Sequence, residues 1–138
     1  MKLFAAALLL ALTVVVHAIG MTALLHWVLR RLARAETRFW VQTWLVVRAA
    51  WCLIAVHLVE IAAWALFYGW QRCFPDLESA FYFSGVTYTT MGYGDLVLPK
   101  EWRLLGPIEA LTGILMCGLS TGFFFALASK LYGVQKAK

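Results

Sequence analysis

Charged residues are scarce in this sequence: they make up 14% of its 138 residues, whereas hydrophobic residues make up 63%. A soluble domain of this length needs far fewer apolar residues to build its core. The composition therefore excludes an ordinary soluble protein and indicates a chain that lies in a lipid bilayer. The net charge of +5 does not indicate a nucleic acid partner, because the basic residues flank the apolar runs instead of covering a soluble face.

Cysteine is also rare, and the 3 cysteines lie too far apart for the spacing of a metal site. Cys52 and Cys117 lie within long apolar runs, where cysteine packs as a small apolar side chain. Cys73 lies between two such runs. Two alternatives remain open for it: an unpaired thiol, or a disulfide with a neighbouring subunit.

The combinations of residues that enzymes need are missing as well. No nucleophile, base and orienting group cluster in the sequence, and no phosphate-binding loop is present. We therefore expect neither enzymatic activity nor a cofactor.

Three apolar stretches, at residues 3–29, 49–70 and 104–129, are long enough to cross a membrane. At about 1.5 Å of rise per helical residue, each can span the roughly 30 Å of a hydrocarbon core. The first contains no charged residue, and the other two contain only Glu60 and Glu109. The sequence predicts an all-α membrane protein with three transmembrane helices.

Basic residues gather after the first and the third of these stretches. They are Arg30, Arg31, Arg34, Arg38 and Arg48, then Lys130, Lys136 and Lys138. Because cytoplasmic flanks carry an excess of lysine and arginine, we expect the C-terminus to be cytoplasmic and the N-terminus to lie outside. We expect an integral protein of the cell membrane, the inner membrane of a bacterium.

A cleaved secretory signal is the alternative for the first stretch, since Lys2, an apolar run and Val16-His17-Ala18 imitate one. The run continues to Leu29 and arginines follow it, which favours a retained helix. The simplest role of this helix is to pack against the second span. Docking of a regulatory partner of unknown identity is the alternative.

A short helix is predicted between the second and third stretches, from Pro75 to about Thr89. Pro75 suits the first turn, and Asp76 and Glu78 suit the positive end of a helix. Such a helix covers only about 20 Å. We therefore expect it to enter the membrane from outside and to stop partway, with its negative end near the bilayer centre.

The residues after this helix must return to the surface as non-helical chain: Thr90, Met91, Gly92, Tyr93 and Gly94. A bilayer tolerates such a segment only where protein or water surrounds it. Glycine adopts backbone angles closed to other residues, so successive carbonyl groups can point the same way. Four such segments around an axis would form rings of oxygens, and two adjacent rings supply the roughly eight oxygens that can replace the hydration shell of K⁺.

With Asp95, these residues form the run Thr-Met-Gly-Tyr-Gly-Asp, which resembles the Thr-X-Gly-Tyr-Gly-Asp signature of potassium channels. The resemblance covers roughly residues 49–130 and implies a pore with outer helix, pore helix, selectivity filter and inner helix. Because one filter segment cannot enclose an ion, we expect a homotetramer that conducts K⁺ passively. The expected parts are an extra transmembrane helix (1–30), a basic cytoplasmic linker (31–43), a potassium channel pore domain (44–130) and a short cytoplasmic tail (131–138).

The resemblance also implies roles for single residues in this run. K⁺ would bind to the backbone carbonyls of Thr90, Met91, Gly92 and Tyr93. The Tyr93 ring would turn outward and brace the loop against the pore helix, and Asp95 would lie at the outer mouth. Met91 stands in place of the usual valine, but its side chain should face away from the ions, so we expect selectivity to be retained.

Val86 is a more important departure from the family. In the best-known bacterial two-helix channel, a glutamate at this position holds the aspartate at the end of the filter. Here Val86 cannot do so. We therefore expect the coupling between Asp95 and the pore helix to be weaker or differently built.

In the third span, Ile114, Cys117, Thr121 and Phe125 recur at spacings of three and four and so share one face of a helix. The resemblance implies that they line the water-filled cavity below the filter. A ring of Phe125 side chains is a candidate gate that closes by dewetting.

Gly113 and Gly118 match the two inner-helix glycines of the family in their separation of five. Gly113 is then the candidate hinge. Close packing against a neighbouring helix is the alternative, because small residues allow helices to approach one another.

Ionisable residues within membrane helices are costly and often functional. Glu109 lies one turn into the third span, where Ser84, Thr87 or Tyr88 can hydrogen-bond it. We expect either a purely structural contact or a support for the back of the filter, with Glu109, Ser84 and Val86 as the candidate supporting residues.

His57 and Glu60 share a face of the second span, and His17 lies at a similar depth in the first. Two alternatives stay open for these three residues. They can form a polar contact between helices, or they can form a pH sensor, because imidazole changes charge near neutrality.

Two rival functions belong to other classes of protein. A transporter that carries four degenerate filter loops in one long chain lacks the complete Tyr-Gly-Asp element that is present here. A non-conducting accessory subunit, which would join another channel through its first helix, would not need an intact filter. We expect no voltage sensor, because no span has arginine at every third position, and no cytoplasmic regulatory domain after the third span.

Overall fold

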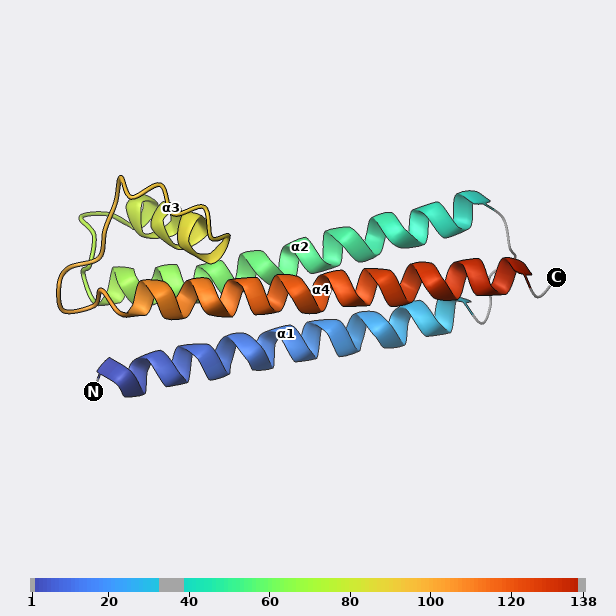
Figure 1. Cartoon of the computed structure of the whole chain (residues 1–138), viewed down its shortest axis with the longest axis horizontal. Coiled ribbons are helices and arrows are strands. Elements are labelled where there is room, and N and C mark those ends of the chain that lie inside the picture. Colours follow the sequence, from blue (N-terminus) through green and yellow to red (C-terminus); the bar gives the residue numbers. More distant parts are fainter. Residues whose placement is uncertain (1, 33–38, 137–138) are drawn as a thin grey trace.

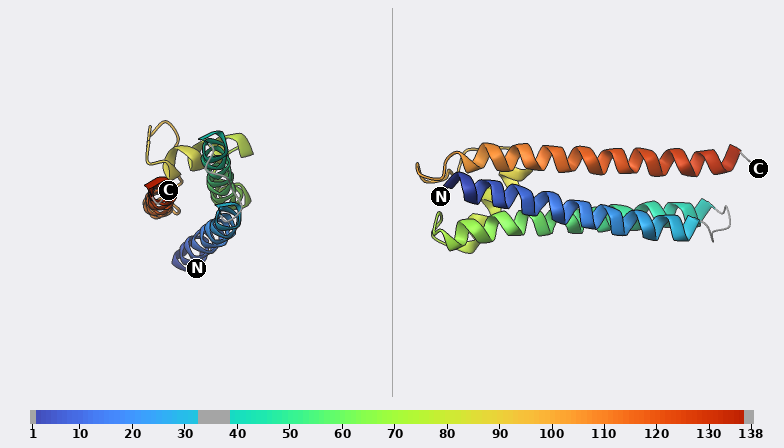
Figure 2. Two further views of the ribbon diagram at one scale, coloured as in Figure 1. Left: turned by 90° about the vertical axis from the view of Figure 1, so that its right-hand side faces the viewer. Right: turned by 90° about the horizontal axis from the view of Figure 1, so that it is seen from below.

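The computed structural model describes residues 2–32 and 39–136, which form α-helices joined by turns and irregular segments, with no strand among them. The helices are α1 (Lys2–Leu32), α2 (Phe39–Trp70), α3 (Leu77–Tyr88) and α4 (Leu105–Lys136). Helices α1, α2 and α4 run along the length of the molecule, and the short α3 lies near one end (Figure 1). Two further views show the same long bundle from its end and from below (Figure 2).

The three long helices contain the candidate membrane spans Phe4–Leu32, Phe39–Trp70 and Leu105–Leu131. Three boundaries differ from those expected, the first being that helix α1 continues to Leu32 instead of ending at residue 30. Helix α2 begins at Phe39, so residues 39–43 are helical instead of belonging to the linker expected at 31–43, and α4 continues to Lys136 into the expected tail. Helical hydrogen bonding does not stop where hydrocarbon ends, and aromatic residues near Phe39 suit the headgroup region. Arg34, Arg38 and Lys138 lie outside the described residues.

Helix α1 packs along α2 and also contacts α4. Gly20 allows a close approach, because a Cβ atom there would lie 2.5 Å from the Val56 side chain. The Trp64 indole N–H donates a hydrogen bond to Thr13 Oγ1 at 3.1 Å, which joins the same two helices within the buried interior. The expected packing of the first helix against the second is confirmed.

Two apolar clusters form the core, one toward each end of the bundle. The cluster at the end that holds α3 includes Ala6, Leu9, Trp64, Tyr68, Phe83 and Leu105. The cluster toward the other end includes Leu24, Val28, Leu45, Ala49, Phe123 and Leu127. Along α1 and α2, the buried His17 and Glu60 lie between these clusters. A polar layer therefore separates two apolar regions.

Helix α3 begins at Leu77 because Asp76 caps it. Asp76 has extended backbone angles, and its Oδ1 accepts a hydrogen bond from the Ser79 N–H at 2.7 Å. Pro75 therefore precedes the cap, and its expected place in the first turn is wrong. The helix ends at Tyr88 with Thr89 as its C-cap, as expected.

The chain runs along α3 from the end of the bundle toward its middle and then returns to the same end before α4 begins (Figure 1). Helix α1 begins at this end, and helix α4 ends at the opposite end (Figure 1). The segment after α3 is thus a returning loop that lies alongside long helices.

Candidate functional site

The segment that returns after α3, residues 90–94, has an unusual backbone, and we call it the returning segment. Positive φ angles occur at every second residue: 61° at Thr90, 56° at Gly92 and 76° at Gly94. Glycine adopts such angles readily, but a β-branched residue such as threonine rarely does. A strained, alternating backbone of this kind indicates a functional constraint on the direction of successive peptide groups.

Hydrogen bonds attach the beginning of this segment to the last turn of α3. The N–H groups of Met91 and Gly92 both donate to the Val86 carbonyl oxygen, at 3.0 and 3.2 Å, and the Thr90 N–H donates to the Thr87 carbonyl oxygen at 2.9 Å. Val86 thus holds the beginning of the segment through its backbone carbonyl. The position of the segment depends directly on the position of α3.

The end of the segment is held by a side chain of α3. The Tyr82 hydroxyl donates a hydrogen bond to Asp95 Oδ2 at 2.7 Å. This contact lowers the pKa of the Asp95 carboxyl below its ordinary value. The coupling of Asp95 to α3 is therefore differently built, as expected from Val86, and Tyr82 lies one helical turn before that residue.

Tyr93 is 65% exposed within one chain. In the single chain, Tyr82 therefore makes the contact between α3 and the Asp95 end of the segment. The expected packing of the Tyr93 ring against the pore helix stays a prediction. Sequence reasoning missed Tyr82. Its position four residues before Val86, and hence on the same helix face, is the signal that could have indicated it.

Glu109 is fully buried, and both of its carboxylate oxygens have partners. Ser84 Oγ lies 2.5 Å from Oε1, and the Tyr68 hydroxyl donates to Oε2 at 2.8 Å. Of the three expected partners, Ser84 is confirmed, whereas Thr87 and Tyr88 do not bond Glu109. These contacts join α2, α3 and α4 through one carboxylate.

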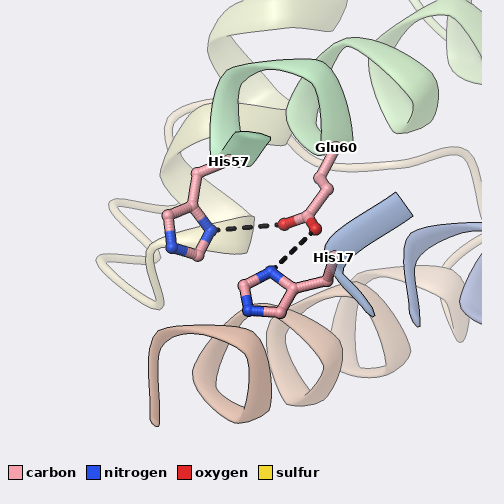
Figure 3. A group of neighbouring side chains, drawn as sticks. All are labelled: His17, His57 and Glu60. Carbon is pink, nitrogen blue, oxygen red and sulfur yellow. Dashed lines mark hydrogen bonds and ion pairs between the residues drawn. The ribbon is translucent and has the colours of Figure 1, made fainter. Parts of the chain in front are cut away.

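A second buried carboxylate, Glu60, lies between two histidines (Figure 3). His17 Nδ1 is 3.0 Å from Oε1, and His57 Nδ1 is 3.2 Å from Oε2. The Tyr88 hydroxyl also donates to Oε2. The expected polar contact between helices is confirmed, and the pH sensor stays a prediction.

The same group extends to the other two helices. His57 Nε2 lies 3.0 Å from Ser120 Oγ on α4, and Tyr88 is the last residue of α3. We name this group the Glu60 cluster; it consists of His17, His57, Glu60, Tyr88 and Ser120. The cluster connects all four helices of the described chain. Tyr88 and Ser120 were not expected, because helix rotation decides which side chains meet.

Gly113 lies where α4 crosses the end of α3. A Cβ atom at this position would lie 2.0 Å from the Tyr88 carbonyl oxygen. The structure therefore supports close packing, the second of the two alternatives for Gly113, and the hinge stays a prediction. Gly118 differs, since a Cβ atom there would meet nothing within 4 Å in one chain.

The expected cavity face of α4 is open in the single chain. Ile114, Cys117 and Thr121 are exposed, and Phe125 is 76% exposed. A large apolar side chain so exposed in the middle of a long helix requires lipid, a partner chain or a pore beside it.

Cys73 packs inside the apolar cluster near α3 and is a free cysteine. Burial raises the pKa of its thiol, so the reactive thiolate is disfavoured. Within one chain Cys73 is therefore an unpaired, poorly reactive thiol, and the disulfide between subunits stays a prediction.

Comparison with known proteins identifies one family. Residues 54–130, more than half of the chain, match the family described as "Ion channel", and the match contains α3, the returning segment and most of α4. No curated protein and no solved structure matches the chain. With its three long apolar helices, the chain is an integral membrane protein, and the matched family is one of transport proteins. It belongs to the ion channel family.

Proposed function

We propose that the chain is one of four identical subunits of a potassium-selective channel, and that K⁺ passes through a filter built from Thr90, Met91, Gly92, Tyr93 and Gly94. The observation that carries this proposal is the positive φ at every second residue of this run. Such alternation suits a strand whose carbonyl oxygens face one side, which is how a potassium filter replaces the water around the ion.

The stoichiometry follows from the number of oxygens that the ion needs. Each chain contributes one carbonyl at each level of the filter, and K⁺ requires roughly eight oxygens from two adjacent levels. Four chains about a central axis supply them. The open face of α4, with Ile114, Cys117, Thr121 and Phe125, then lines the cavity, and Phe125 is the candidate gate.

The direction of α3 favours a cation in the cavity below the proposed filter. A helix carries roughly half a negative charge at its C-terminal end. Four α3 helices that enter the membrane from outside would direct these ends at the cavity below the filter. The orientation with the N-terminus outside and the C-terminus in the cytoplasm of a bacterial cell places the basic residues after α1 and α4 on the inner side.

Reconstitution of the purified chain tests this proposal. In liposomes without any other protein, we expect uptake of K⁺ or Rb⁺ and a bi-ionic reversal potential that gives a permeability for K⁺ at least tenfold above that for Na⁺. An accessory subunit would give no uptake. A permeability ratio near one would contradict the filter assignment.

External acid should reduce the flux through the effect of protons on Asp95. An ionised carboxylate at the outer mouth attracts cations. Because Tyr82 lowers the pKa of Asp95, the carboxylate stays charged as the external pH falls through the ordinary aspartate range, and flux should decrease only below it. In Tyr82→Phe the hydrogen bond is lost, so we expect the decrease at a higher pH.

The measurement is Rb⁺ uptake as a function of external pH in wild type, Tyr82→Phe and Asp95→Asn. The last variant has no carboxyl group at this position and should lose this step of the pH profile. If Tyr82→Phe and the wild type share one midpoint, Tyr82 does not control Asp95.

A further inference from the structure

The Glu60 cluster contains more ligating groups than a simple ion pair needs. His17, His57 and Glu60 each offer one ligand atom, and these atoms all lie within 4.8 Å of one another. We propose that these three residues bind a divalent transition metal ion of the zinc type, which joins α1 to α2 inside the membrane. This site goes beyond ion conduction and does not depend on it.

The distances suit a small ion. A tetrahedral zinc ion with bonds of about 2.0 to 2.1 Å separates its ligand atoms by roughly 3.3 Å. The distances from Glu60 Oε1 to His17 Nδ1 and from Oε2 to His57 Nδ1 are 3.0 and 3.2 Å. The two nitrogens face different oxygens of one carboxylate, and one ligand atom from each of the three residues lies within 4.8 Å of the others, so the side chains would have to draw together around the ion (Figure 3).

Ser120 prepares His57 as a ligand. In the tautomer that donates its Nε2–H to Ser120 Oγ, at 3.0 Å, His57 presents the lone pair of Nδ1 toward Glu60. A second hydrogen bond of this kind on the far nitrogen is the usual way in which proteins orient a metal-binding histidine. In this tautomer the lone pair and the carboxylate repel each other unless a cation lies between them, whereas in the other tautomer Nδ1–H donates to Glu60 and Nε2 accepts from the Ser120 hydroxyl.

His17 can offer the lone pair of Nδ1 to an ion in one of its two tautomers. The side chain is almost completely buried, and its Nε2 has no hydrogen-bond partner among the described residues. With the proton on Nδ1, His17 donates to Glu60 Oε1 and only the Nε2 lone pair is unused. With the proton on Nε2, the Nδ1 lone pair faces Oε1 and the Nε2–H has no acceptor among the described residues. In this second tautomer a metal ion at Nδ1 would use the lone pair that faces Glu60, and the Nε2–H would still lack an acceptor.

The chemistry of the donors selects the class of metal. Two imidazole nitrogens and one carboxylate oxygen suit zinc and its neighbours, whereas calcium and magnesium prefer oxygen ligands alone. The Tyr88 hydroxyl lies 3.0 Å from His57 Nδ1 and also contacts Glu60, so it faces the fourth position. The His57 side chain is 19% exposed in one chain.

The position of the site gives the ion a structural effect. Tyr88 precedes the C-cap of α3 and the returning segment, and Ser120 lies on α4. An ion held by His17 and Glu60 would therefore fix α1 to the helices that support the segment at residues 90–94. Helix α1 lies outside the ion channel domain at residues 54–130. The proposal gives this helix a function of its own, which is to hold the ion through His17.

Cobalt binding tests the site directly. The full chain, purified in lipid nanodiscs and stripped with a chelator, is titrated with Co²⁺, whose visible absorption reports tetrahedral coordination. We expect saturation at one Co²⁺ per chain, displacement by Zn²⁺, and at least a tenfold loss of affinity in both His17→Asn and Glu60→Gln. His26→Asn is the matched control, because His26 is exposed on α1 as well, and its hydrogen-bond partner among the described residues is the Thr22 carbonyl.

Two results would overturn the proposal: no tetrahedral Co²⁺ absorption in the wild type, or equal loss of binding in His26→Asn. If His17→Asn and Glu60→Gln do not fold, X-ray absorption of Zn²⁺ bound to the wild type decides the question. Two imidazole ligands are then expected, and a spectrum without imidazole would exclude the site. Because these measurements need no ion flux, they stand or fall separately from potassium conduction.

Discussion

Replacing Gly113 by alanine is expected to abolish conduction and to destabilise the protein. The added Cβ atom would lie 2.0 Å from the Tyr88 carbonyl oxygen and 2.8 Å from its carbonyl carbon. These are backbone atoms that cannot rotate away, so α4 and the end of α3 must separate. Overpacking of this kind typically costs about 1–3 kcal/mol, and the displaced Tyr88 supports both the Glu60 cluster and the returning segment. Rb⁺ uptake should fall at least tenfold, and the midpoint of thermal unfolding should fall with it.

Gly118→Ala is the matched control on the same helix. A Cβ atom at Gly118 meets nothing within 4 Å in one chain, and alanine favours a helix over glycine by about 1 kcal/mol. This variant should therefore keep its thermal midpoint. The pair of variants also separates the two roles of Gly113. If Gly113 served only as a hinge, Gly113→Ala would lose flux without losing stability.

The long helices could be predicted from hydrophobicity because each carries its own signal. An apolar run of the right length is helical in a bilayer whatever surrounds it. The ends were less predictable. Phe39 starts α2 well before the apolar stretch at 49–70, because interfacial aromatic residues continue a helix that hydropathy alone would end.

Contacts between helices could be predicted only in part. The pairing of Glu60 with His17 and His57 follows from depth and spacing, since a buried carboxylate must find donors at its own level. The addition of Tyr88 and Ser120 to this cluster depends on how α3 and α4 rotate about their axes. No single stretch of sequence contains that information.

The contact at Asp95 shows the same limit. The sequence indicates that Val86 cannot hold Asp95, and a different coupling was expected on that ground. Which residue replaces it could not be decided, because several polar and aromatic side chains of α3 lie near the loop. The structure selects Tyr82, whose hydroxyl reaches Asp95 Oδ2 at 2.7 Å.

Replacing Gly92 by alanine is expected to remove the proposed preference for K⁺ over Na⁺. Gly92 has a φ of 56°, and a Cβ atom there would meet nothing within 4 Å in one chain, so the obstacle is the backbone angle and not a steric contact with neighbours. An alanine in the left-handed region costs roughly 1–2 kcal/mol, and a tetramer contains the substitution four times. The segment should relax, its carbonyls should turn away from the axis, and the K⁺ to Na⁺ permeability ratio should fall toward one.

Bi-ionic reversal potentials of the reconstituted variants measure this effect, and Met91→Val supplies the control. Met91 is adjacent to Gly92 but lies outside the positive φ positions, and its side chain is exposed in one chain. Valine is the usual residue of potassium channels at this position, so selectivity should be unchanged in Met91→Val. A Gly92→Ala channel that still prefers K⁺ strongly would contradict this account. The backbone would then tolerate a side chain at Gly92, and the left-handed angle there would not be what directs the carbonyl groups toward the axis.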